Sequence, residues 1–200
     1  MTEMTDLDAK QVSDELLYDG FFQMKRYRFR HRLFAGGWAP EVTREVFERQ
    51  ECVSVLPYDP AQDKVVLIEQ FRPGPMAAGD KEPWITEIIA GIAEADETLE
   101  DVARREAMEE AGCEIGEMEA ISSHYVSPGG STEVMHIFCG LTDSNGIGGI
   151  YGLESEGEDI RVFTEPFEDA YRRVKQGSLR NSFTIIALQW LALNRERLAA

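Results

Sequence analysis

The sequence predicts a mixed α/β fold, with an antiparallel β-domain at the N-terminus followed by a sandwich of sheets between helices. Three observations predict it. Residues 24–33 alternate cationic with aromatic or apolar side chains, and Gly36-Gly37 separates them from a second expected strand at 41–49, which is typical of a β-hairpin. Residues 84–111 follow the pattern of a strand, a glycine-bearing loop and a helix. Strands and helices then interleave to the C-terminus without an internal repeat.

The N-terminal region divides into a polar tail and a basic hairpin. Residues 1–15 are polar and are expected to be loose. In the strand expected at 24–33, four arginines alternate with aromatic and apolar residues, which gives one cationic and one apolar face. A second strand is expected at 41–49. This basic arm, residues 21–49, is either a solvated edge protected by its charge or a surface for a substrate or a partner subunit.

The remaining elements are short and are bounded by turn residues. Strands are expected at residues 51–57, 64–71, 84–90, 114–126, 133–141 and 160–164. Helices are expected at 99–111, at 168–176, and from a cap at Asn181 or Ser182 to about residue 197. Residues 73–81 and 143–157 are rich in glycine or proline and are expected to be loops. Because no helix directly follows its GIGG, the second loop is interpreted as flexible rather than phosphate-binding. We expect two domains, residues 1–50 and 51–200.

Composition narrows the classes of function. Of the 200 residues 43% are apolar, which is enough for a substantial core. The net charge of −17 argues against a nucleic-acid or anionic-membrane partner, since phosphate backbones are held by clustered Lys and Arg. The charge is also uneven, at −11 over residues 82–119 and +4 over 21–49. An acidic cradle and a basic arm in one protein suggest an anionic substrate that arrives with cations.

Cysteine usage and the N-terminus bear on the compartment. Cys52, Cys113 and Cys139 are scattered and lack CxxC spacing, so neither a disulfide framework nor a zinc site is indicated. A reducing cytoplasm fits best. The acidic N-terminus has no apolar signal-peptide core, and no run approaches 18 apolar residues, so neither a signal peptide nor a membrane span is expected.

The strongest chemical signal lies on the helix expected at 99–111. Glu106, Glu109 and Glu110 stand at i, i+3 and i+4, so their carboxylates share one face beside the apolar stripe. Mutually repelling anions in that position make sense if Mg²⁺ or Mn²⁺ neutralises them. For such a segment alone, a solvated helix face would be the simpler interpretation.

The wider spacing favours the metal site. It matches the Nudix box at every fixed position: Gly91, five residues, Glu97, seven residues, Arg105-Glu106, two residues, Glu109-Glu110, one residue and Gly112. Ser127-Pro128-Gly129-Gly130 places Pro128 fifteen residues after Cys113, as in the ADP-ribose pyrophosphatases of the Nudix superfamily. The resemblance extends over nearly all of residues 18–195.

This resemblance implies a fold, a reaction and an assembly. The fold would be a Nudix αβα sandwich, with an N-terminal β-domain exchanged across a homodimer. The reaction would be hydrolysis of ADP-ribose to AMP and ribose 5-phosphate with Mg²⁺, for which Mn²⁺ could substitute. Two alternatives stay open: a Nudix pyrophosphatase for another nucleoside diphosphate sugar or dinucleotide, and a non-catalytic ligand-sensing domain. The intact glutamates count against the second alternative.

The resemblance also implies residue roles. Metal would be held by the carbonyl of Ala90 and by Glu106, Glu109, Glu110 and Glu158. Arg105 and Glu97 would brace the box, with Gly91 and Gly112 structural. The late loop, which begins at residue 143, ends in Glu154, Glu156 and Glu158. From the residues alone, these acids either keep the loop solvated or supply a base. The resemblance assigns the base to Glu156. The substrate would be held by Phe21, Phe22, Arg44, Glu45, Arg49, Arg72, Ile92, Ser127, Pro128, Gly129 and Glu133.

Overall fold

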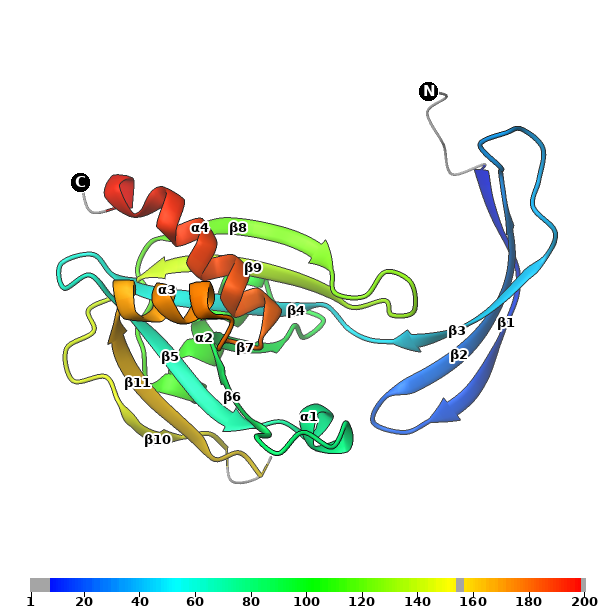
Figure 1. Cartoon of the computed structure of the whole chain (residues 1–200). Helices are drawn as coiled ribbons and strands as arrows, with labels where there is room; N and C mark the ends of the chain where they lie inside the picture. Colours follow the sequence, from blue (N-terminus) through cyan, green and yellow to red (C-terminus); the bar gives the residue numbers. More distant parts are fainter. Residues whose placement is uncertain (1–7, 154–156, 199–200) are drawn as a thin grey trace. The chain divides into compact units, whose positions relative to one another are not determined.

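The computed structural model describes residues 8–153 and 157–198 and has a mixed α/β architecture (Figure 1). Its contacts group the chain into two compact units, residues 1–50 with 125–134, and residues 51–124 with 135–200. The first unit contains a three-stranded antiparallel sheet and the second most of an eight-stranded sheet with its helices. The predicted mixed α/β fold with an N-terminal antiparallel β-domain is therefore confirmed.

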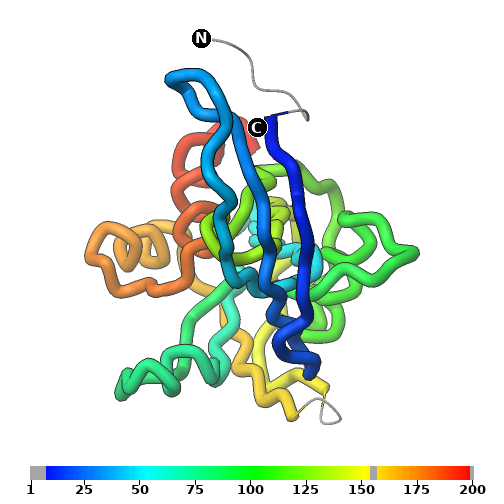
Figure 2. The backbone as a smooth tube through the Cα atoms, turned by 90° about the vertical axis from the view of Figure 1, so that its right-hand side faces the viewer, coloured from blue at the N-terminus to red at the C-terminus, as the bar shows by residue number. Residues whose placement is uncertain are grey.

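The first unit is built from three long strands that lie side by side (Figure 2). These are β1 (Ala9–Asp19), β2 (Gln23–His31) and β3 (Val42–Glu48), in the order β1-β2-β3. Between β2 and β3, Gly36 and Gly37 have φ of 90° and 81°, a backbone region that residues with a β-carbon rarely adopt. The predicted hairpin is present at this glycine turn.

Residues 1–15 were expected to be loose; residues 1–7 lie outside the described ranges, and from Ala9 on strand β1 corrects the expectation. It pairs antiparallel with β2 from Ala9 opposite His31 to Asp19 opposite Gln23. All eleven of its residues are exposed. A strand without a buried face leaves no apolar alternation in the sequence, so the period-two signal was missing.

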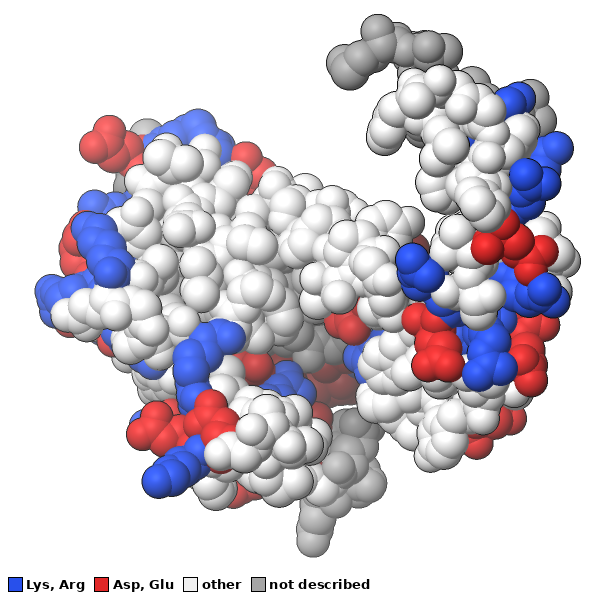
Figure 3. Space-filling view, turned by 45° about the vertical axis from the view of Figure 1, so that its right-hand side comes forward, with Lys and Arg blue, Asp and Glu red and all other residues white. Residues whose placement is uncertain are grey.

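Acidic side chains neutralise the cationic face of β2. Arg26 pairs with Glu15 of β1 at 3.0 Å and with Glu45 of β3 at 3.3 Å, and Arg28 pairs with Glu41. Figure 3 shows the two signs of charge intermixed over this unit. The arm is thus a sheet with ion pairs between its strands rather than a continuous basic surface.

The second unit centres on the eight-stranded sheet. Six strands run in the order β10-β11-β5-β4-β9-β8, with β6 paired to β5 and β7 to β4. Their bounds are β4 Cys52–Asp59, β5 Lys64–Phe71, β6 Trp84–Glu87, β7 Ile89–Ile92, β8 Met118–Tyr125, β9 Val134–Leu141, β10 Gly149–Tyr151 and β11 Ile160–Pro166. β4 and β9 are parallel, whereas the other pairs with a determined register are antiparallel.

Helices cover both faces of this sheet. Val53 and Val55 of β4 pack in a core with α2 (Leu99–Ala111), whereas Leu56 and Tyr58 belong to a core with α3 (Phe167–Gln176) and α4 (Ser182–Leu198). Successive side chains of β4 point to opposite faces of the sheet, so they contribute to two separate cores. The result is the predicted sandwich of a sheet between helices. No helix in the described ranges is both long and apolar enough to cross a bilayer.

Three local predictions were wrong. The loop expected at 73–81 contains a short helix, α1 (Pro73–Ala77), begun by a proline whose fixed φ suits the first turn. The strand expected at 84–90 is broken at Ile88, whose N–H bonds the hydroxyl of Thr184 on α4 instead of a neighbouring strand. Part of the loop expected at 143–157 is β10, which pairs with β11.

Candidate active site

The glutamate-bearing helix α2 has the predicted bounds. Thr98 caps its N-terminus by accepting a hydrogen bond from the N–H of Asp101 at 3.2 Å, and Gly112 ends it with φ of 56°. Gly91 of β7 lies against this helix. A β-carbon there would fall 1.8 Å from Glu106 Oε1, so the strand gives room to the carboxylate.

Arg105 organises the acidic face of α2. Its Nε and Nη2 donate to the two carboxylate oxygens of Glu97 at 2.8 and 2.9 Å. Its Nη1 donates to Glu106 at 2.7 Å and to Glu109 at 3.1 Å. Nη2 also reaches the carbonyl oxygen of Ile92 at 3.3 Å. The hydrogen bond from Arg105 is the main cause that lowers the pKa of Glu97, and this bidentate pair fixes the loop ahead of α2.

Glu110 is buried and Glu106 is half-buried, which makes them the least exposed acids of the helix. Glu110 is only 4% exposed and accepts a hydrogen bond from the backbone N–H of Ala90 at 3.1 Å. Burial raises the pKa of Glu110 to about 8, against the effect of the Ala90 N–H. Burial likewise raises the pKa of Glu106, against its bond to Arg105. Burial therefore disfavours the ionised form of both carboxylates unless further positive charge is present.

Glu158 adds a third negative charge to this group. Its charge helps to raise the pKa of both Glu106 and Glu110. Its Oε2 accepts from the N–H of Leu153 at 3.1 Å, which closes the base of the late loop. The predicted base, Glu156, lies outside the described residues.

The donor set suits a hard divalent cation. Carboxylates and a carbonyl are the oxygen ligands that such ions take, and burial disfavours the anionic form of Glu106 and Glu110 unless positive charge is added. In the described ranges, however, no three His, Cys, Asp or Glu side chains converge as a ready ligand cluster. Two reasons are visible: Glu106 and Glu109 bond Arg105, and Glu110 bonds the Ala90 N–H. The donor set therefore fits a divalent cation by its chemistry, while in this structure its carboxylates bond protein partners instead.

Arg72, predicted to hold substrate, stands at the end of β5 directly before α1. Its Nε donates to Glu87 Oε2 at 2.8 Å. The positive charge of Arg72 also acts on Glu110, where it partly opposes the rise in pKa that burial causes. Sequence reasoning did not single out Glu87. The available signal was an acid inside the otherwise apolar run that leads to Gly91.

The first unit brings together four predicted substrate residues. The guanidinium of Arg49 lies 4.2 Å from the ring centroid of Phe22 and donates from Nε to Glu133 at 3.1 Å. Thr132 holds the Arg49 backbone, since its hydroxyl bonds both the N–H and the carbonyl of that residue. Phe21 packs edge-on against Phe22 and is 86% exposed. An exposed aromatic beside a held arginine suits a planar, anionic ligand.

The other predicted substrate residues are placed as follows. Arg44 and Glu45 are exposed neighbours on β3, opposite Tyr27 and Arg26 of β2. Ser127, Pro128 and Gly129 form a turn closed by bonds from the N–H groups of Gly130 and Ser131 to the Ser127 carbonyl. Ile92 ends β7 and contributes its carbonyl to Arg105.

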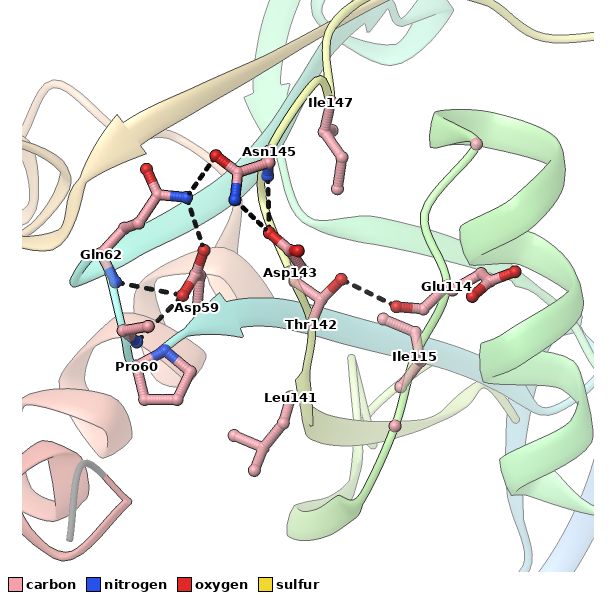
Figure 4. A pocket seen from close by; sticks show the side chains of 13 residues that line it. Asp59, Pro60, Gln62, Glu114, Ile115, Leu141, Thr142, Asp143, Asn145 and Ile147 are labelled. Carbon is pink, nitrogen blue, oxygen red and sulfur yellow. Dashed lines mark hydrogen bonds between the residues drawn. The ribbon is translucent and has the colours of Figure 1, made fainter.

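A cavity of about 760 Å³ opens elsewhere in the second unit, near the C-terminal end of α2 (Figure 4). Of the predicted site residues only Gly112 lines it. Its polar groups bond one another: Asp59 accepts from Gln62 and Ser144, and Asp143 from Asn145. These bonds join the β4–β5 turn to the loop after β9. The cavity is a structural recess apart from the glutamate cluster.

Known proteins resemble this chain over most of its length. A family model described as "NUDIX domain" matches residues 48–183. The ADP-ribose pyrophosphatase of Escherichia coli (strain K12) is 47% identical over 193 residues, covering 96% of this chain and 91% of that protein. The ADP-ribose pyrophosphatase of Haemophilus influenzae is 42% identical over 193 residues, covering 96% and 89%.

More distant similarities bear on specificity and fold. A GDP-mannose pyrophosphatase of Escherichia coli O1:K1 is 34% identical over 184 residues, covering 92% of this chain and 94% of that protein. The solved structure described as "Crystal structure of ADP compounds hydrolase" matches with a TM-score of 0.74 over 99% of this chain and 100% of that one. At 15% identity this last similarity concerns the fold alone.

Proposed function

The chain belongs to the Nudix family, and on this premise we propose that it hydrolyses the diphosphate bond of ADP-ribose to AMP and ribose 5-phosphate. The observation that carries the proposal is the group of Glu106, Glu109 and Glu110 on α2, braced by Arg105 beside Gly91. A diphosphate between two sugars is doubly negative, so a nucleophile cannot approach until that charge is withdrawn. Cations bound by a face of carboxylates would neutralise this charge.

The metal is a divalent cation, and we assign it as Mg²⁺, with Mn²⁺ as a substitute. Ala90, through its carbonyl, and Glu106, Glu109, Glu110 and Glu158 would hold it. When bound, it would neutralise phosphate charge and make water a better nucleophile. Arg105 and Glu97 keep the box in shape, and Glu156 orients or deprotonates the attacking water. Arg72 and Arg49 offer guanidinium forks to phosphate oxygens, and Phe21 and Phe22 offer ring faces to a base.

The assembly we propose is a homodimer in which the N-terminal β-domain is exchanged between subunits. An eleven-residue strand that is exposed on both faces, such as β1, is unusual in a protein that acts alone. We also assign the protein to the cytoplasm, because Cys113 and Cys139 are buried thiols that suit a reducing compartment.

A second candidate substrate is another nucleoside diphosphate sugar. The 34% identity to a GDP-mannose pyrophosphatase favours it as the alternative, and the higher identity to ADP-ribose pyrophosphatases favours ADP-ribose. A ligand-sensing domain without catalysis is disfavoured, since it would have no need for crowded buried carboxylates.

The test is an assay of the purified protein with Mg²⁺ and a panel of nucleoside diphosphate compounds, with products identified by chromatography. Glu106→Gln and Glu110→Gln should each lower kcat by about two orders of magnitude or more, on the scale of a lost charge stabiliser. Glu100→Gln is the matched control, because Glu100 is an exposed acid in the first turn of the same helix. Near-normal turnover of either variant at saturating Mg²⁺ would overturn the metal assignment.

A further inference from the structure

Resting on the proposed hydrolysis of a diphosphate, we propose that Glu87, itself held by Asn181, is a positioning residue that fixes the guanidinium of Arg72 for a substrate phosphate. None of the sequence motifs includes Glu87 or gives Asn181 a role in the site. The proposal follows from a buried chain of hydrogen bonds that runs from α4 to Arg72.

The first link is the ion pair between Arg72 and Glu87. Nε and Nη2 of Arg72 both lie 2.8 Å from Glu87 Oε2. The Arg72 side chain is 38% exposed, whereas that of Glu87 is 5% exposed. Within the described part of the chain the pair uses the Nε and Nη2 side of the fork, so Nη1 remains for another acceptor. A guanidinium pinned at one edge and open at the other is arranged for a phosphate oxygen.

The second link fixes Glu87 itself. Asn181 Nδ2 donates to Glu87 Oε1 at 2.9 Å, so both carboxylate oxygens are engaged. Asn181 Oδ1 accepts from the N–H of Thr184 at 3.0 Å and from its hydroxyl at 2.9 Å, which caps α4. Glu87, Asn181 and Thr184 are all buried. The two ends of one amide therefore tie the start of a packed helix to the partner of Arg72.

The third link connects this chain to the box. The hydroxyl of Thr184 accepts from the N–H of Ile88 at 3.0 Å. Two residues later the N–H of Ala90 bonds Glu110. The segment that breaks the strand between β6 and β7 thus carries the anchor of Arg72 at one end and the contact to Glu110 at the other. Its fixed backbone sets the position of the arginine relative to the carboxylates.

An ion pair that only stabilises the fold would also explain Arg72 and Glu87, so the test must separate the two roles. Because the long arginine side chain is ordered by folding, its rotamer entropy is not lost again when substrate binds. Loosening Arg72 should therefore weaken substrate binding, whereas a structural pair should change the unfolding temperature alone.

The experiment is a double-mutant cycle on kcat and KM for ADP-ribose with Mg²⁺, using wild type, Glu87→Gln, Arg72→Ala and the double variant. Glu87→Gln is nearly isosteric and should raise KM about tenfold with a smaller change in kcat. In the Arg72→Ala background it should have no further effect, because Glu87 acts through Arg72. Asn181→Ser keeps an oxygen for the helix cap but removes the donor to Glu87, and should raise KM in the same direction.

The matched control is Glu69→Gln. Glu69 accepts from Nε and Nη2 of Arg161 at 3.0 and 2.7 Å, which is a similar fork between neighbouring strands of the same sheet. Its loss should leave KM unchanged. Two outcomes would overturn the proposal. One is that Glu87→Gln raises KM in the Arg72→Ala background as much as in the wild type. The other is that KM of Glu87→Gln equals that of the control. If wild type failed to hydrolyse ADP-ribose, the proposed function would fail. Calorimetric titration with inorganic diphosphate would still decide on Glu87, since the variant should bind it about tenfold more weakly.

Discussion

Gly91 and Glu106 share one small space between β7 and α2. A β-carbon at position 91 would fall 1.8 Å from Oε1 and 1.9 Å from Cδ of Glu106. The glycine is therefore required by the close approach of a carboxylate rather than by a left-handed backbone. The sequence motif joins these residues because one leaves room for the other.

Gly91→Ala tests this relationship. The new methyl group meets the flexible end of a side chain, so the fold should survive while the Glu106 carboxylate is displaced. We expect kcat to fall by about 10²-fold, the scale of a catalytic group misplaced by about 1 Å, with little change in the unfolding temperature. Gly74→Ala is the control, since a β-carbon there meets nothing within 4 Å. Wild-type kcat in Gly91→Ala would show that Glu106 does not need this position.

The raised pKa of Glu110 predicts how stability of the metal-free protein depends on pH. Below its unfolded value of 4.5 both states carry the proton, and between 4.5 and about 8 only the folded state keeps it. Because the folded state binds more protons, the free energy of unfolding should fall with rising pH across this window, by at most about 1.4 kcal/mol per unit. Denaturant unfolding in a chelator at several pH values measures it.

Glu110→Gln isolates the effect of that one carboxyl group. Relative to the variant, the unfolding free energy of the wild type should decrease steadily from pH 5 to pH 8. Mg²⁺ should flatten the wild-type slope, because a bound cation favours the ionised carboxylate. Parallel pH profiles of the two proteins in chelator would contradict the assignment.

Helix α2 was predictable because all its determinants are local. The Thr98 cap, the Gly112 terminator and the glutamate spacing each act over only a few neighbouring residues, and the observed helix has the predicted bounds. The core strands were predictable for the same reason. Strand β5, for example, has the predicted bounds, since its run of β-branched and apolar residues is continuous and follows turn residues directly.

What the sequence could not supply depends on distant partners. Strand β1 exists through pairing with β2, and the break at Ile88 exists because Thr184, 96 positions away, takes its N–H. Glu87 looked like one acid among many until its bonds to Arg72 and Asn181 were known. Such contacts join residues that no local pattern relates.

The proposed exchange of the arm predicts complementation between inactive chains. Arg44→Ala should disable the arm, and Glu106→Gln should disable the box. If each site of a homodimer combines the box of one chain with the arm of its partner, co-refolded equal mixtures should recover about one quarter of wild-type activity, because half the dimers are mixed and each has one intact site. Light scattering on the same samples measures the dimer. Activity no higher than that of either parent, or a stable active monomer, would count against shared sites.

The last prediction concerns the base. Carboxylates bound to a cation are poor proton acceptors, so the group that orients or deprotonates water should come from outside α2. Glu158, two residues after the predicted base, lies near enough to Glu106 and Glu110 for its charge to contribute to the raised pKa of both. Glu156→Gln should therefore lower kcat by about 10²-fold while substrate and Mg²⁺ affinities stay nearly intact. Glu158→Gln is the contrast and should weaken Mg²⁺ binding. Steady-state kinetics with a parallel binding titration decide it: an unchanged kcat, or a loss confined to KM, would remove Glu156 from the mechanism.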